Sequence, residues 1–161
     1  MAVVLITSIL AVTGVSVFRK YIFASKGAEA TSVIQALRSA EEAYMAENHV
    51  YLNVSAGLNW YPRATPNKDR VAWGGPSPDL VRWQALAPAI SRSVSYSYLV
   101  NAGIAGDPIP KPQSVRDPNF ALPTQSWYLI QAEGDSDGDG IFASYVSTSM
   151  SNEIYSERTD E

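Results

Sequence analysis

The sequence predicts an α+β fold, in which one long amino-terminal helix packs on a carboxy-terminal antiparallel sheet. Two observations predict this class. Apolar residues recur at helical spacing through the first third of the chain, where no Pro precedes Pro62. Strand-like runs separated by turn residues fill the last third. The 161 residues suit one domain, and 46% hydrophobic with 17% charged residues is not a disordered composition.

The first 18 residues, Met1–Phe18, contain no charge, and all 12 basic and 16 acidic residues follow them. Arg19 and Lys20 come directly after this apolar run. A signal peptide would place basic residues before the run and a small-residue cleavage site after it, so we expect no cleavage here. The basic pair fits either interfacial anchors or ion-pair partners between subunits.

Two other interpretations of the apolar run remain. A membrane span needs about 20 apolar residues, so this run with its hydroxyl residues is marginal. The other is a helix that first spans a membrane and later packs against copies of itself. Small and hydroxyl side chains allow close helix approach and favour this interpretation. The expected interface residues are Val3, Val4, Ile6, Ile9, Leu10, Val12, Val15, Val17 and Phe18.

Helical spacing continues through Tyr21–Asn48, where Gly27 is the one helix breaker and costs only about 1 kcal/mol relative to Ala. We therefore expect one helix from about residue 2 to residue 48, roughly 70 Å long at 1.5 Å per residue. A domain of this size is only roughly 30 Å across, so half of the helix must project from it. Residues 1–24 form the expected membrane or filament-core half, and residues 25–161 the head. The predicted packed face comprises Ala30, Val33, Leu37, Ala40 and Tyr44, with Lys26, Glu29, Arg38, Glu41, Glu42 and Glu47 largely elsewhere.

The connection from Val50 to Pro88 is rich in Pro and Gly and lacks periodicity. It also holds three of the four Trp residues, Trp60, Trp73 and Trp83, so we expect it to be packed. A short helix is expected around Asp79–Leu86.

The remaining chain is predicted to form a sheet. A Pro-rich loop over Gly103–Pro123 and a hairpin connection over Gly134–Gly140 separate the strand-like runs. The expected strands are Ser93–Val100, Ser126–Glu133, Ile141–Thr148 and a short last one at Glu153–Tyr155.

The hairpin connection contains the most specific local motif, Asp135, Asp137 and Asp139 at alternate positions, closed by Gly140. Carboxylates at this spacing converge when the chain turns, as at the start of a calcium loop. Asp and Gly are also favoured in ordinary hairpin turns. Calcium binding and a bare polar turn are both open interpretations.

The motif does not continue as an EF-hand. The position of the bidentate Glu falls on Val146, and no flanking helices are evident. Glu133 or Glu153 could instead complete a calcium site.

Composition excludes several function classes. A net charge of −4 without a basic stripe gives no support for nucleic-acid binding. The absence of Cys excludes disulfides and thiolate metal sites. His49 is the only His, so neither a zinc site nor a catalytic triad is apparent, and we expect no enzyme activity.

Several segments together resemble one family. Met1–Tyr21 is similar to the amino-terminal helix of type IV pilins and of the related pseudopilins of type II secretion systems. The similarity begins part-way along that family helix. Ala40–Tyr51 resembles the end of the pilin helix, and Trp83–Pro88 with the following Tyr-rich strand resembles the start of the pilin sheet. The hairpin at Gly134–Gly140 and the segment Asn152–Tyr155 resemble those of certain Cys-free bacterial pilins.

The resemblance implies a pilin fold and a structural subunit of a helical filament, with the apolar helix in the filament core and the head on its surface. It implies that copies of the chain are partners of one another. Further partners would be the bacterial inner membrane before assembly, where the subunit has a single span, and the assembly platform. The final location would be a cell-surface pilus, or the periplasm for a pseudopilin.

The chain also departs from the family pattern. The basic leader ending in Gly, followed by Phe and then Glu, is missing, so we expect the mature family start to lie several residues before Met1. Three explanations of the missing signature remain open. The gene has an earlier start codon, residues before Met1 are missing from the sequence, or the protein is a divergent member of the family. Ser8 and Ser16 stand in place of helix-softening Gly and Pro, and the carboxy-terminal Cys pair is absent.

Two alternatives accompany the pilus interpretation. A pseudopilin would suit the Asp/Gly loop, whereas the long Trp-rich connection and large head favour a pilin. A membrane-anchored binding domain that never polymerises would use a pocket among Trp60, Trp73, Trp83 and Trp127. Such domains usually follow a flexible linker, and the unbroken helix argues against one. Motility, adhesion, DNA uptake and secretion are all compatible roles.

Overall fold

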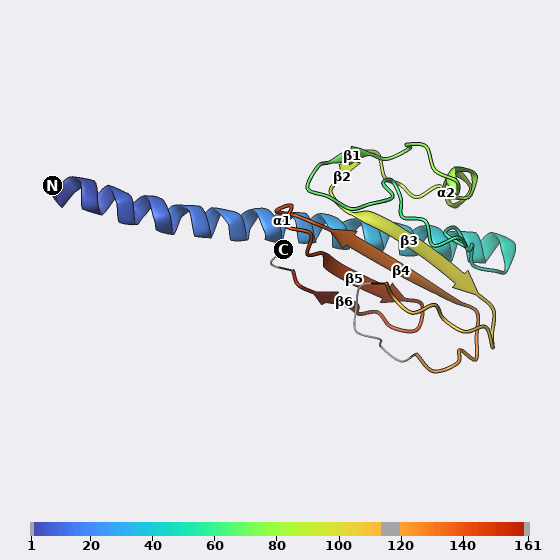
Figure 1. Cartoon of the computed structure of the whole chain (residues 1–161). Coiled ribbons are helices and arrows are strands. Elements are labelled where there is room, and N and C mark those ends of the chain that lie inside the picture. The colour runs from blue at the N-terminus through green and yellow to red at the C-terminus, as the bar shows by residue number, and fades with distance from the viewer. Residues whose placement is uncertain (1, 114–119, 160–161) are drawn as a thin grey trace.

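The structure is a computed structural model that describes residues 2–113 and 120–159, with side chains from Phe18 onward. One helix, α1, runs without interruption over Ala2–Asn48. Its amino-terminal half extends away from the rest of the molecule, and its carboxy-terminal half lies along a sheet (Figure 1). The predicted length and continuity of the helix are confirmed.

The main sheet has four antiparallel strands in the order β3-β4-β5-β6. Each strand is joined to its sequence neighbour, so the sheet is a simple meander. Its registers pair Val100 with Ile130, Ile130 with Ser147, and Ser147 with Ile154. The α+β class and each of the four predicted strand regions are therefore confirmed. The strand bounds are Ser97–Gly103 for β3, Trp127–Gly134 for β4, Ala143–Thr148 for β5 and Ile154–Glu157 for β6.

The predicted strand over residues 93–100 is split in two. Its first part, β2 (Ser93–Val94), leaves the main sheet and pairs with β1 (Val71–Ala72). Beside the second part, the Tyr61 and Tyr98 backbones exchange two hydrogen bonds of 3.0 and 2.6 Å. The connection after α1 thus covers the outer edge of β3, which local alternation could not predict.

The connection is packed as expected. It includes α2 (Leu80–Leu86), in which Trp83 is buried, and Trp73, which precedes α2 and is half-buried. The Trp83 ring stacks on Tyr61 with centroids 4.8 Å apart, and both rings meet Trp73 edge to face. This aromatic cluster holds an irregular segment in place through the large side-chain area that it buries, and not through regular backbone hydrogen bonding.

The apolar face of α1 forms one side of the core. Ala30, Val33 and Leu37 are buried, and Ala40 and Tyr44 are partly buried against the same cluster, which confirms the predicted face. The sheet residues opposite them include Tyr128, Ile130, Ala132 and Tyr145.

Two acidic residues of α1 do not lie where the sequence predicted. Glu29 accepts a hydrogen bond from the Ser95 backbone at 2.6 Å and pairs with Arg70 at 2.8 Å. Glu41 is fully buried and accepts a hydrogen bond from the Leu52 backbone at 2.9 Å. The prediction that these two side chains point away from the packed face is wrong, because each is needed by a backbone N–H of a distant segment.

The second face of the sheet is also covered. Trp127, Leu129 and Val146 form a smaller apolar cluster, against which Ile109 and Phe120 of the Pro-rich loop pack. This cover explains why all residues of β4 and β5 are buried rather than every second one.

Gly27 has a packing role in the helix. A Cβ at this position would lie 2.6 Å from the Tyr145 hydroxyl, so the strand side chain occupies the space that any other residue would need. The helical cost of this Gly is therefore offset by close contact between α1 and β5.

Candidate functional site

The first candidate surface is the projecting part of α1. Among its described side chains, Phe18 and Tyr21 are 65% and 73% exposed, and Ile22 is also exposed. Arg19 and Lys20 lie beside them in solvent. Exposed aromatic and apolar side chains in consecutive helical turns form a surface suited to association with another apolar surface.

The other predicted interface residues occupy the same helix. Its backbone continues to Ala2, but the side chains of Val3, Val4, Ile6, Ile9, Leu10, Val12, Val15 and Val17 lie outside the described part of the structure. Within the described residues, no helix carries an apolar stretch long enough to cross a membrane.

The second candidate site is the acidic loop between β4 and β5. The structure brings Asp135, Asp137 and Asp139 together, with one carboxylate oxygen from each within 4.8 Å of the others. Asp135 is buried at the end of β4, whereas Asp137 and Asp139 are exposed. The predicted convergence of these three side chains is confirmed.

Backbone hydrogen bonds shape the loop. The Asp135 carboxylate accepts from the Gly138 and Gly140 backbone at 2.6 and 3.2 Å. Asp139 accepts from Ile141 at 2.7 Å. Both glycines have φ near +87°, which disfavours other residues there. These bonds fix the turn in which the three carboxylates lie close together.

The loop is also tied to the helix. The Lys26 ammonium group donates to the Ser136 carbonyl at 2.9 Å. Burial lowers the pKa of Lys26, an effect that the nearby Glu29 and Asp135 carboxylates oppose. The cation therefore lies at the junction of α1 and the loop, where it partly neutralises the acidic cluster.

The structure places the three positions that the sequence offered for extending a calcium shell as follows. Val146, at the EF-hand Glu position, is buried in β5. Glu153 precedes β6 at the other end of β5, next to the turn that binds Arg38, so it lies away from the loop. Glu133 is buried two residues before Asp135 in β4. The loop thus offers three converging carboxylates toward the six to eight oxygens that calcium takes, leaving room for carbonyl and water ligands.

Calcium is expected to raise the melting temperature of the protein by a few degrees relative to EDTA, because an ion held by three carboxylates stabilises the folded state by mass action. Magnesium at equal ionic strength is the control, since it is slower to give up its water shell. Asp137→Asn with Asp139→Asn should abolish the calcium effect. Equal melting temperatures in calcium, magnesium and EDTA would establish the loop as a bare turn.

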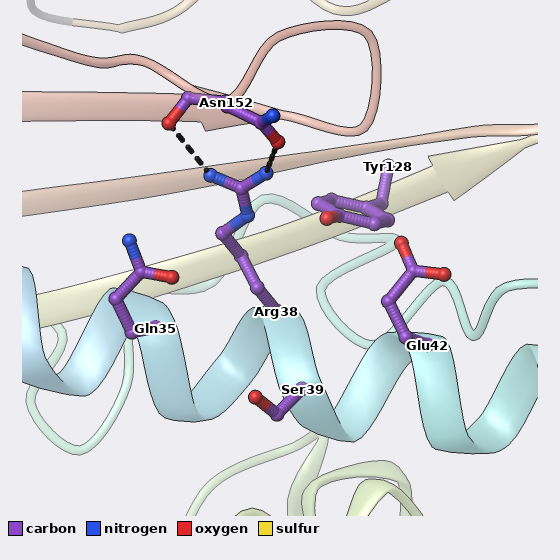
Figure 2. A pocket seen from close by; sticks show the side chains of 6 residues that line it. All are labelled: Gln35, Arg38, Ser39, Glu42, Tyr128 and Asn152. Atoms are coloured by element: carbon purple, nitrogen blue, oxygen red, sulfur yellow. Dashed lines mark hydrogen bonds between the residues drawn. The ribbon is translucent and has the colours of Figure 1, made fainter.

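The third feature is an open polar groove of about 730 Å³ beside α1 (Figure 2). Arg38 crosses it and donates to the Asn152 carbonyl and side-chain oxygens at 3.1 and 3.2 Å. Glu42 lies next to Tyr128 on the same side of the helix (Figure 2). The Arg38 fork thus fastens the turn before β6 to the helix, a role that a disulfide could fill in a chain with Cys. The groove is lined by Gln35, Arg38, Ser39, Glu42, Tyr128 and Asn152.

Glu41 is the ionisable group that sequence reasoning missed. Burial raises the pKa of Glu41 to about 7, while the Leu52 backbone N–H partly opposes this change. The other oxygen, Oε1, has no hydrogen-bond partner among the described atoms. An acidic residue four positions after the apolar Leu37 was the only sequence signal that this carboxyl faces the core.

Comparison of the chain with protein-family models, with curated proteins and with solved structures finds no match.

Proposed function

We propose that this protein is a structural subunit of a helical filament of the type IV pilus class, with a pilin fold. The observation that carries the proposal is α1, a single 47-residue helix that is half packed into a head and half projecting. The exposed apolar side chains of the projecting half need a covering surface, which a membrane or other subunits can supply.

The projecting half of α1 can be buried in two places, a membrane and the core of a filament. An uncharged run at the short end of spanning length can rest in the inner membrane as a single span and can also leave it. In a filament, the same surface packs against the helices of neighbouring copies. Burial there contributes about 25 cal/mol per Å² of apolar area removed from water.

The association would be open-ended. The projecting helix of one copy meets surfaces on others that differ from itself, and a head-to-tail contact that does not close on itself generates a helical polymer. The heads would form the outer surface, and an assembly platform in the inner membrane would supply subunits.

The continuity of α1 weighs against a non-polymerising anchored domain. Such a domain needs no rigid connection to its anchor, whereas this helix passes from the apolar run into the core without a break. The described Trp residues also offer no shared pocket, because Trp83 and Trp127 lie in separate apolar clusters on opposite faces of the sheet.

The test is to shear filaments from cells that produce the full chain and to identify this protein and its amino terminus in them by mass spectrometry. Phe18→Asp should lower its amount in the sheared fraction by about tenfold or more, since the charge would be buried between subunits. Leu122→Asp is the matched control, because Leu122 is 69% exposed on the head.

The membrane fraction is measured in parallel to show that each variant is made. Filaments lacking the protein, or equal yields from Phe18→Asp and the wild type, would contradict the proposal. Recovery of the protein only from membranes would favour the anchored-domain alternative.

A further inference from the structure

The charges near the two ends of the described part of α1 differ in sign. From Phe18 to Ala28 the helix carries three bases and no acid, and from Ser39 to Asn48 it carries three acids and no base. Between these two segments lie Glu29 and Arg38, one charge of each sign. The helix therefore has a basic segment where it leaves the head and an acidic segment at its far end.

The four charges from Lys26 to Glu41 are satisfied within the subunit. Lys26 binds the Ser136 carbonyl, Glu29 binds Arg70, and Arg38 binds Asn152. Glu41 is buried and binds the Leu52 backbone. These four residues are committed to the fold and are not available to a partner.

Charges toward the two ends are not satisfied in this way. Within the described part of the chain, Arg19, Lys20 and Glu47 make no hydrogen bond or ion pair, and all three are exposed. Glu42 is exposed and forms no ion pair among the described residues, although its carboxylate accepts hydrogen bonds from the Tyr51 hydroxyl at 3.3 and 3.4 Å and interacts with Tyr128. Two bases at one end and two acids at the other thus have no opposite charge paired with them among the described residues.

We propose that Arg19 and Lys20 of one subunit lie against Glu42 and Glu47 of a neighbouring parallel copy in the filament. The proposal rests on the proposed function and specifies its subunit register. Complementary charge sets the register and excludes shifted alternatives, in which like charges would meet.

The register has a geometric consequence. Residues 19–20 and 42–47 are separated by about 33 to 42 Å along a helix with a rise of 1.5 Å per residue. Two parallel copies displaced by that length place the head of one beside the projecting half of the other. The same displacement would cover Phe18, Tyr21 and Ile22, which the isolated subunit exposes.

The first test is a charge exchange scored by the sheared-filament yield. Arg19→Glu with Lys20→Glu should lower the yield by about tenfold or more, and so should Glu42→Lys with Glu47→Lys. The fourfold variant, which restores opposite signs, should recover most of the yield. Lys68→Glu with Arg92→Glu reverses two exposed bases of the head and should leave the yield near wild type.

The second test uses the absence of Cys from the chain. A Lys20→Cys, Glu47→Cys double variant, treated in filaments with a short bis-maleimide, should give a ladder of covalent multimers. Each single variant can give dimers at most. The ladder reports the register even if a charge variant fails to fold.

The outcomes separate the two proposals. Wild-type filaments with neither rescue nor a ladder would overturn the register and leave the filament function standing. Cross-linked dimers without higher multimers would indicate a closed antiparallel pair and would also overturn it. Absence of the wild-type protein from sheared filaments would overturn the filament function and the register together.

Discussion

Replacing Glu41 by Gln is expected to remove most of the pH dependence of stability between about pH 5 and about pH 8. Burial raises the pKa of this carboxyl from 4.5 to about 7, so the folded protein binds more protons than the unfolded chain in this range. The contribution is therefore fully present below pH 4.5 and is lost as pH rises through about 7. Linkage gives a loss on the order of 3 kcal/mol.

Gln retains an oxygen that can accept the Leu52 N–H but cannot ionise. The variant should thus equal or exceed the wild type at alkaline pH and lose its advantage at acidic pH. Thermal unfolding of the full chain in detergent, followed by near-ultraviolet circular dichroism over a pH series, measures this. Glu47→Gln makes the same charge change at an exposed site of α1 and serves as the control. An unchanged pH slope in Glu41→Gln would show that this carboxyl does not titrate as its burial implies.

Trp83→Ala is expected to destabilise the head by about 3 to 5 kcal/mol, the range for loss of a buried large aromatic side chain. The Trp83 side chain is only 2% exposed and stacks on Tyr61 at 4.8 Å. Its removal would open a cavity beneath the connection that covers β3. Since domains unfold at about 5 to 15 kcal/mol, this is a large share of the total.

Trp83→Phe separates packing from polarity in that cluster. The Trp83 indole N–H has no hydrogen-bond partner among the described atoms, so a ring without it should cost much less than Ala. Denaturant unfolding of the three proteins gives the comparison. A loss below about 1 kcal/mol in Trp83→Ala would contradict a packed connection.

Part of the fold was predictable because its signals are local. The helix to Asn48, the packed face through Leu37 and the four strand regions each follow from a period in consecutive residues. The acidic loop belongs to the same group, since its three carboxylates are within five residues and converge through the turn itself. The exposed basic pair after the apolar run was also evident from order alone.

The tertiary structure decided which charged side chains of α1 form hydrogen bonds within the fold. Glu41 reaches a backbone N–H 11 residues away, Glu29 one 66 residues away, and Arg38 an oxygen 114 residues away. The spacing of Glu41 after Leu37 does not by itself distinguish it from Glu47, which follows the partly buried Tyr44 at helical spacing and stays in solvent. The proposed register depends on that distinction, because only charges left over by the fold are available to a neighbour.

By itself, the sequence determined a long helix with an uncharged beginning, the strand regions of an antiparallel sheet and an acidic hairpin turn, since each is encoded by neighbouring residues. Only the tertiary structure decided that Tyr61 covers the edge of β3, that Gly27 makes room for Tyr145, and that a carboxyl of α1 is buried in the core. The physical reason is that hydrogen-bond satisfaction and close packing depend on which distant segments come into contact, and one-dimensional patterns do not contain that information.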